Sequence, residues 1–381
     1  MKFVVRLKTT SRRILLLLGI TLLITPTNLT TLCAQSHPED VHPEGSAEHH
    51  ATKKEEHGEE SFDPSSFIID HIKDSHEWHL WTNQEGHHVS VHLPVILFSK
   101  HSGFHVFMSK KLAHGHTYKG FRMGQGENEG KIVEVNDRGE LVEAGLPLDF
   151  SLTKNAFMML LAVVILIALF LSLARSYKRV GVSEPRGIQG FLEPLIVFVE
   201  EDIARPNIGE EKYRPFMPYL LTVFFFILTL NLMGLIPFFP FGANVTGNIA
   251  VTMVLALFTF FIVQFSGNRA YWQHIFNTPG VPWWLKYPVP MMPLVELVGM
   301  ISKPFALMVR LFANITAGHI IVMSLVSLIF IFKTAALAPA SALFVIFMDL
   351  LEMLVAFLQA YVFTLLSALF IGLAMPEHHH D

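Results

Sequence analysis

The stretch MVRLFANITAGHIIVMSLV, residues 308–326, decides how this sequence is interpreted. It is apolar enough to lie in a membrane, yet it contains Arg310, whose guanidinium is effectively always protonated. At the centre of a bilayer an Arg costs about 2.5–3.5 kcal/mol on insertion scales. A charge kept at that cost indicates a function in which Arg310 faces a partner or a cavity.

The whole chain has the composition of a membrane protein. Of its 381 residues, 51% are hydrophobic and only 16% are charged, and 33 are Phe. The net charge of −4 gives no sign of nucleic-acid binding, and a single Cys fits a protein without disulfides. Many of the charged residues and most of the His lie in 37–150, whereas 215–268 carry no charge. This contrast predicts a polar N-terminal domain followed by a membrane domain.

Residues 1–35 are predicted to be a secretory signal peptide. Basic residues precede a short apolar core, 14–24, which is shorter than the about 20 residues of a membrane span. An uncleaved anchor is the alternative, because Leu32 is not the small residue usually found near a cleavage site. Cys33 would allow a lipoprotein, although TTLC lacks the small residue expected before such a Cys.

Residues 36–150 are predicted to form an exported polar domain. To about residue 61 the sequence is charged and nearly free of large apolar residues, which predicts disorder. HHVSVHLPVILFS (87–99) and GFHVFMS (103–109) have the β-branched and aromatic residues of strands, and KIVEVNDRGELVE (131–143) is typical of a hairpin. We therefore expect a small β-containing domain outside the membrane.

Residues 151–381 are predicted to be the membrane domain, with five spanning helices. Its apolar stretches are 156–174, 215–239, 249–265, 291–332 and 341–375. Basic residues crowd the connection 175–214 and are nearly absent from 240–248 and 333–340, so the first span is expected to end in the cytoplasm. The N-terminal domain would then lie outside and the C-terminus inside.

Two more features complete the predicted all-α, multi-pass fold. Segment 188–204 is apolar on one side and acidic on the other, which predicts an amphipathic helix on the cytoplasmic surface. The last two stretches, as helices, would be up to about 60 Å long against a bilayer core of about 30 Å. They are therefore expected to form a strongly tilted helical hairpin that turns at 333–340.

The hairpin is predicted to bring polar residues together in pairs. Arg310 and Gln359 are one such pair about the expected turn. His319 and Glu352 are a second pair with nearly the same midpoint. Asn314 shares a helix face with Arg310, whereas His319 is about half a turn out of phase with Arg310 and about 13 Å along the axis. The sequence thus predicts a lone cation facing one way and a His–Glu pair facing another.

At these residues the chain resembles the a subunit of F-type ATP synthases. SKPFALMVRLFANITAGHII (302–321) resembles the family's signature, with its essential Arg at Arg310 and its Asn at Asn314. LLEMLVAFLQAYVFTLLSALFIGLA (350–374) resembles its final helix, with the Gln at Gln359. LTLNLMGLIP and GANVTGNIAVTMVLAL are also similar to family sequences, and the resemblance runs from about residue 149 to the C-terminus.

Two features depart from the well-known members. Many bacterial members carry Glu and His where this chain has His319 and Glu352, so the pair is exchanged, as in mitochondrial members. The polar domain at 36–150 has no counterpart in their short N-termini.

The resemblance implies a stator subunit facing a rotating ring of c subunits, in a bacterial inner membrane, with b subunits and the rest of the F1Fo complex as partners. It implies that Arg310 promotes deprotonation of the ring carboxylate and blocks leak between two offset half-channels. The proton pathway is expected to include His319, Glu352, Asp349 and, on the cytoplasmic side, Glu296.

Other chemistries and classes find less support. His76 and His79 lack a carboxylate or Cys that would complete a zinc pattern, and GxxxxGK[ST] is absent, so we expect no metal, no cofactor and no enzyme activity by the chain alone. A secondary transporter would show internal repeats and broken helices. A passive subunit of a respiratory complex would not need an Arg without a counter-ion. Coupling to H⁺ or to Na⁺ stays open, because the ring largely decides the ion.

Overall fold

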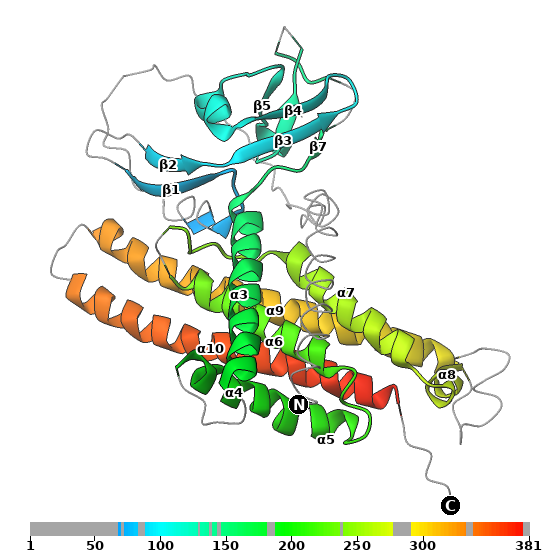
Figure 1. Ribbon diagram of the computed structural model, residues 1–381. Helices are drawn as coiled ribbons and strands as arrows, with labels where there is room; N and C mark the ends of the chain where they lie inside the picture. The colour runs from blue at the N-terminus through cyan, green and yellow to red at the C-terminus, as the bar shows by residue number, and fades with distance from the viewer. Residues whose placement is uncertain are drawn as a thin grey trace, which may run out of the picture.

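The computed structural model consists of a bundle of apolar helices that carries a small β domain at one end (Figure 1). It describes residues 68–69, 72–82, 88–128, 130–136, 139–142, 146–180, 187–236, 239–276, 291–332 and 338–375. The predicted signal peptide, the predicted disordered segment up to residue 61 and most of the predicted turn at 333–340 lie outside the described residues.

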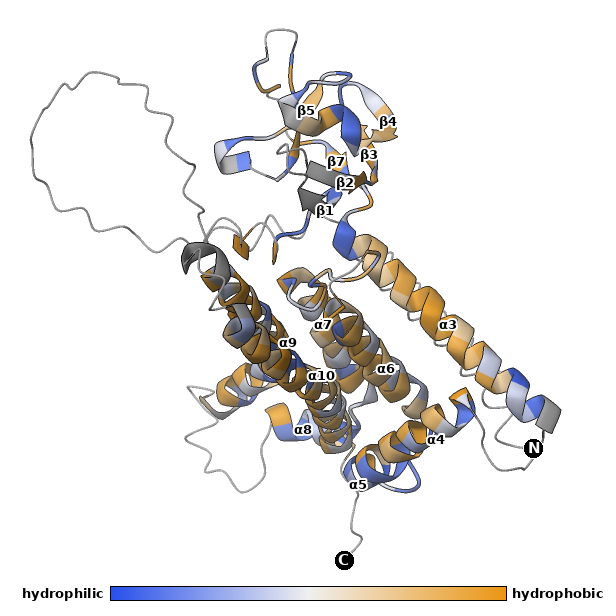
Figure 2. Cartoon of the chain, turned by 90° about the vertical axis from the view of Figure 1, so that its left-hand side faces the viewer, coloured by the Kyte–Doolittle hydropathy of each residue, from blue (hydrophilic) through white to orange (hydrophobic). Residues whose placement is uncertain are grey.

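Within the described residues five helices are long and apolar enough to cross a membrane, which confirms the five predicted spans. They are α3 (Lys154–Val180), α6 (Met217–Gly234), α7 (Ile249–Ser266), α9 (Met291–Phe332) and α10 (Ala338–Leu373). Hydrophobic residues dominate these helices (Figure 2). α6 ends before the expected residue 239, because Gly234 and the following Pro237 and Pro240 disfavour helix. The chain is a multi-pass membrane protein.

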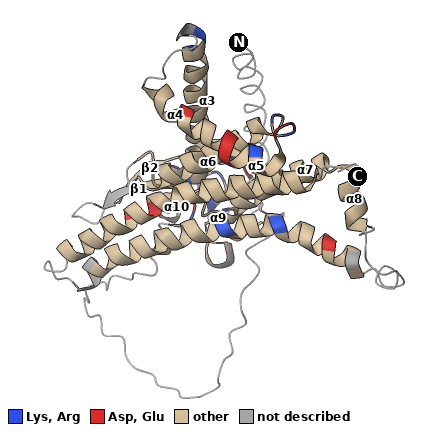
Figure 3. Cartoon of the chain, turned by 90° about the horizontal axis from the view of Figure 1, so that it is seen from below, with Lys and Arg blue, Asp and Glu red and all other residues tan. Residues whose placement is uncertain are grey.

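α9 and α10 are the longest helices and run side by side, steeply inclined to α3 (Figure 1). Pro304 lies inside α9 without ending it. A straight helix of 42 residues is about 63 Å long, so α9 fits a bilayer core of about 30 Å only when it lies obliquely. Charged residues are sparse along both helices (Figure 3).

Shorter helices lie at the bundle end away from the β domain. α4 (Ile188–Phe198) and the π-helix η4 (Val199–Ala204) occupy the segment 188–204 that was predicted to be one amphipathic helix, and α5 (Arg205–Ile208) follows it. Arg205 bonds Glu200 within this segment, with Nη2 3.3 Å from Oε1. α8 (Arg269–Phe276) was not predicted, since it is too short to show a clear helical period.

The β domain consists of three small antiparallel sheets, β1–β2, β4–β3–β7 and β5–β6. The strands are β1 (Glu77–Thr82), β2 (His88–His92), β3 (Pro94–Ser99), β4 (Gly103–Met108), β5 (Phe121–Met123), β6 (Ile132–Glu134) and β7 (Leu148–Asp149). Short 3-10 helices, η2 (Ser109–Gly115) and η3 (Gly126–Asn128), connect them. Strand β1 was not predicted, and its pairing with β2 is irregular between His79 and Trp81.

The helices pack around α6. Of its 18-residue span 78% is buried inside the protein, against 17–33% for the other four spans. α6 is therefore the central helix, and the others leave much of their apolar surface to face lipid or partners.

Candidate functional site

The polar residues of α9 and α10 meet where the sequence register places them. His319 Nδ1 lies 3.9 Å from Glu352 Oε1, and the two side chains are only 13% and 5% exposed. This contact joins the two long helices deep in the apolar bundle. The predicted pairing of His319 with Glu352 is confirmed.

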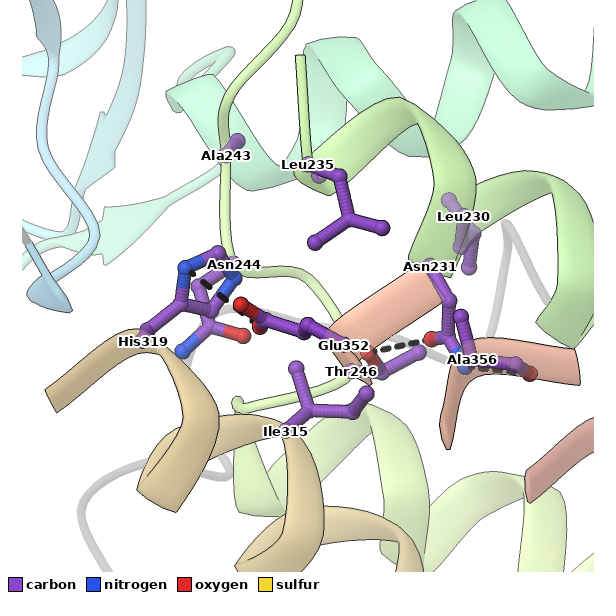
Figure 4. Close-up of a pocket in the computed structure, with 11 residues that line it drawn as sticks. Leu230, Asn231, Leu235, Ala243, Asn244, Thr246, Ile315, His319, Glu352 and Ala356 are labelled. Carbon is purple, nitrogen blue, oxygen red and sulfur yellow. Dashed lines mark hydrogen bonds and ion pairs between the residues drawn. The ribbon is translucent and has the colours of Figure 1, made fainter. Parts of the chain in front are cut away.

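The pair lies in a pocket that α6 and the α6–α7 loop complete (Figure 4). Asn231 of α6 accepts a hydrogen bond from the Thr246 hydroxyl at 2.7 Å. Its amide also donates to the carbonyl oxygen of Ala356 on α10, at 3.4 Å. Asn244 accepts a bond from the Gly247 amide at 2.9 Å and so shapes the loop. Four separate chain segments thus supply the lining.

Two polar atoms in this pocket are buried without a hydrogen bond to any described residue. They are Glu352 Oε1 and Asn244 Nδ2. The side chains pack closely and leave almost no free volume between them. A buried polar atom without a hydrogen bond is costly. The pocket thus places an imidazole and a carboxylate, two groups that serve in proton transfer, side by side.

Of the two glycines beside the His and Glu side chains, one is needed for them to come together. A Cβ on Gly318 would lie 2.8 Å from Glu352 Oε1, which is closer than real Cβ atoms approach. A Cβ on Gly234 would lie 3.8 Å from His319 Nε2, an ordinary contact. Gly318 is therefore the glycine that the pair requires.

Arg310 lies on a different face of α9, as the helical phase predicts. It is exposed, and it forms no hydrogen bond or ion pair with any residue that the structure describes. Gln359 is buried, and its Oε1 accepts a hydrogen bond from Asn314 Nδ2 at 2.8 Å. The register had paired Gln359 with Arg310, whereas the bonded residue is Asn314, one turn further along α9. Asn314 and Gln359 therefore lie between the unpaired cation and the His–Glu pair.

The other two predicted site residues lie outside the pocket. Asp349 is exposed on α10, one turn from Glu352, and forms no hydrogen bond or ion pair within the described part of the chain. Glu296, on the other end of α9, lies 3.9 Å from His274 Nδ1 of α8. His274 was not predicted as a site residue.

A second cavity, of about 20 Å³, lies between α7, α8, α9 and α10. Its polar lining includes Gln264, Tyr271 and Lys303. The Lys303 ammonium lies 5.5 Å from the centre of the Phe370 ring, within the range of a cation–π contact. The Lys303 side chain therefore has a defined place against α10.

Sequence reasoning missed the polar residues that α6 and its loop bring to the pocket. Asn231, Asn244 and Thr246 lie in motifs that resemble the family, but no role was assigned to them. The available signal was a set of uncharged amides and hydroxyls within the long charge-free region. Such groups are costly in lipid unless they are bonded to each other or line a cavity.

The fold and the site define a multi-pass membrane protein with an ionisable site inside the bundle, a feature of membrane proteins that move ions. The family model described as ATP synthase A chain matches residues 156–372, and the chain belongs to this family. Residues 67–150 match a second model, described as a domain of unknown function.

Curated relatives agree with this assignment. The chain is 47% identical over 239 residues to ATP synthase subunit a of Chloroherpeton thalassium, covering 61% of this chain and 69% of the relative. It is 50% identical over 241 residues to ATP synthase subunit a 2 of Chlorobaculum tepidum, covering 61% and 66%. It is 47% identical over 241 residues to ATP synthase subunit a of Myxococcus xanthus, covering 61% and 76%.

Proposed function

We propose that this chain is the proton-translocating stator subunit of an F-type ATP synthase. It would face a rotating ring of c subunits, each with one carboxylate at mid-membrane, and would be held by b subunits. Family membership supports this role. The observation that carries it is the arrangement of α9: on one face its His319 meets the buried Glu352 of α10, and on another face Arg310 has no ion-pair partner among the described residues.

The proposed outer half-channel leads past His319 and Glu352. A proton that arrives from outside exchanges through this pair and neutralises a ring carboxylate. The neutral carboxyl can then turn through lipid without the cost of a buried charge. Asn231, Asn244 and Thr246 provide the polar lining that a proton path through an apolar bundle requires.

Arg310 acts on the returning ring carboxyl. An opposite charge nearby lowers a carboxyl pKa by about one to three units, which favours release of the proton. Because Arg does not lose its own proton, it also prevents direct transfer between the two half-channels. Each charge that crosses the membrane yields about 2.3 kcal/mol per 100 mV.

The released proton leaves on the opposite side, past Glu296. The contact between Glu296 and His274 puts two titratable groups at that end of α9. Basic residues in the 175–214 connection support a cytoplasmic location for this end and an exported β domain. The two half-channels are then offset along α9, so that the ring must rotate for a proton to pass.

The test is ATP-driven proton pumping in inverted vesicles of the assembled complex, with and without Na⁺. Arg310→Ala removes the positive charge and should abolish coupled pumping. Arg310→Lys should abolish it as well, because Lys can lose its proton when buried. The matched control is Arg175→Ala, which removes an exposed cation at the end of α3. Near-normal pumping by Arg310→Lys would refute the proposed role, and a strict requirement for Na⁺ would change the coupling ion.

A further inference from the structure

The β domain is anchored in the helical bundle by two side chains. Its own core is a separate cluster made of Val95, Leu97, Phe107, Leu112, Phe121 and Ile132. Trp78 and Leu93 do not belong to that cluster. They are 7% and 5% exposed and are buried in the core of the helices. The β domain is therefore packed into the membrane part rather than merely tethered to it.

The Trp78 ring connects α3 to the α6–α7 loop. Its centre lies 5.8 Å from that of Phe157 on α3, at an interplanar angle of 86°. It lies 5.5 Å from the ring of Phe239 in the loop, at 88°. Edge-to-face contacts of this kind are favourable beyond the burial of their area. The position of Phe239 thus depends on the position of Trp78.

Strand β1 is in turn fixed to the start of α3. The Lys154 amide donates to the Ser75 carbonyl oxygen at 3.0 Å. The Asn155 amide donates to Asp74 Oδ1 at 3.1 Å, which caps the helix from the β domain. His76 Nε2 lies 3.2 Å from Asp149 Oδ2. We call these contacts, made by residues 74–76 with residues 149–155, the joint, and they hold Trp78 in register with α3.

The loop that Trp78 contacts is the loop that lines the pocket. Asn244 and Thr246 are only 5% and 2% exposed, and both face the pocket that contains His319 and Glu352 (Figure 4). Between Phe239 and Asn244 the loop is also bonded to α6, since the Gly242 amide donates to the Met233 carbonyl oxygen at 3.1 Å. A shift of the loop would therefore change how the amide of Asn244 meets the pair.

We propose that Trp78 is a positioning residue of the outer polar pocket: through Phe239 it holds the 239–248 loop so that Asn244 and Thr246 stay against His319 and Glu352. This inference rests on the proposed function, because it assigns the β domain a part in proton entry. Among the described residues His319 and Glu352 are the titratable groups that line this pocket, and Asp349 lies one turn away at the surface of α10.

The test compares Trp78→Ala, Trp78→Phe and Phe104→Ala in the full complex. Phe104 is an aromatic residue of the same domain that is 65% exposed on β4, so its removal is the matched control. Passive proton flux would be measured in vesicles stripped of the catalytic sector, with matched complex content, over about pH 5.5–8.5, where His titrates. Trp78→Ala should lower the flux by about threefold to tenfold through the loss of two ring contacts. It should also shift the midpoint of the pH dependence, whereas Trp78→Phe should restore most of the flux.

A Trp78→Ala complex with the flux and midpoint of Phe104→Ala would overturn the inference. If the Trp78→Ala complex fails to assemble, Phe239→Ala removes the same ring contact from the loop side. A Phe239→Ala complex whose proton flux has the wild-type pH midpoint would also overturn the inference. If the unmodified complex and the Arg310→Ala complex carry the same proton flux, the proposed function is refuted, and this inference with it.

Discussion

The His76–Asp149 pair of the joint and the His319–Glu352 pair between α9 and α10 use the same chemical groups in different ways. Both oxygens of Asp149 are bonded, one by His76 at 3.2 Å and the other by the Ser151 amide at 2.7 Å. Glu352 Oε1 has no hydrogen bond to a described residue and lies 3.9 Å from its His. A fully bonded carboxylate fastens two segments, whereas one left unbonded in a polar pocket is available to exchange a proton.

The first prediction replaces each carboxylate by its isosteric amide. Glu352→Gln should lower ATP-driven proton pumping by about tenfold or more, because an amide cannot take part in acid–base exchange. Asp149→Asn, the matched change in the other pair, should leave most of the pumping intact. Pumping would be compared in vesicles with equal complex content, and equal losses in both variants would remove the distinction between the two pairs.

The second prediction exchanges the two members of the membrane pair. His319→Glu combined with Glu352→His should retain more proton flux than either single change. Each single change places two like groups side by side, and like charges raise the cost of ionising both. The flux would be followed across about pH 5.5–8.5, the range where His titrates. A double variant no better than the worse single variant would show that the residues are not functional partners.

The third prediction tests whether the pair needs its close approach. Gly318→Ala puts a methyl group 2.8 Å from Glu352 Oε1, so the carboxylate must move away from His319. Pumping should fall several-fold. Gly299→Ala is the control on the same helix, because a Cβ there meets nothing within 4 Å. If both variants pump equally well, the position of Glu352 Oε1 does not limit transport.

The smallest expected effect is that of acid pH on the stability of the joint. Burial raises the pKa of Asp149, but the bonds from His76 and Ser151 outweigh it and hold the pKa below the ordinary value of 3.8. A lowered pKa contributes stability that is present above the unfolded pKa and is lost as pH falls through the folded pKa. Burial raises the pKa of Asp74, so ionisation of this carboxyl disfavours the folded state, whereas ionisation of Asp149 favours it.

In the Asp149→Asn variant the joint should therefore be looser than in the wild type at neutral pH. Acid should then weaken the joint less than it does in the wild type. Hydrogen exchange of the first α3 amides would report this, measured in the purified complex between about pH 3 and pH 7. Exchange with the same pH dependence in Asp149→Asn and wild type would show that the bonds of Asp149 do not fasten the joint.

Much of the membrane part could be predicted from the sequence, because hydropathy is a property of one segment at a time. The predicted stretch 291–332 has the same bounds as α9. The partnership of His319 with Glu352 was also accessible, since both flank one turn and an antiparallel hairpin has a single register. The exact partner of Gln359 could not be predicted from the sequence, because side-chain direction and helix crossing decide between Arg310 and Asn314.

The sequence by itself determined five apolar spans, a polar N-terminal part, and a cation separated along α9 from a His–Glu pair. These follow from composition and helical period, which act locally. Only the tertiary structure decided that Asn231, Asn244 and Thr246 complete the pocket and that Trp78 reaches the loop carrying two of them. The reason is that such contacts join segments far apart in the chain, and their packing is set by all the helices together.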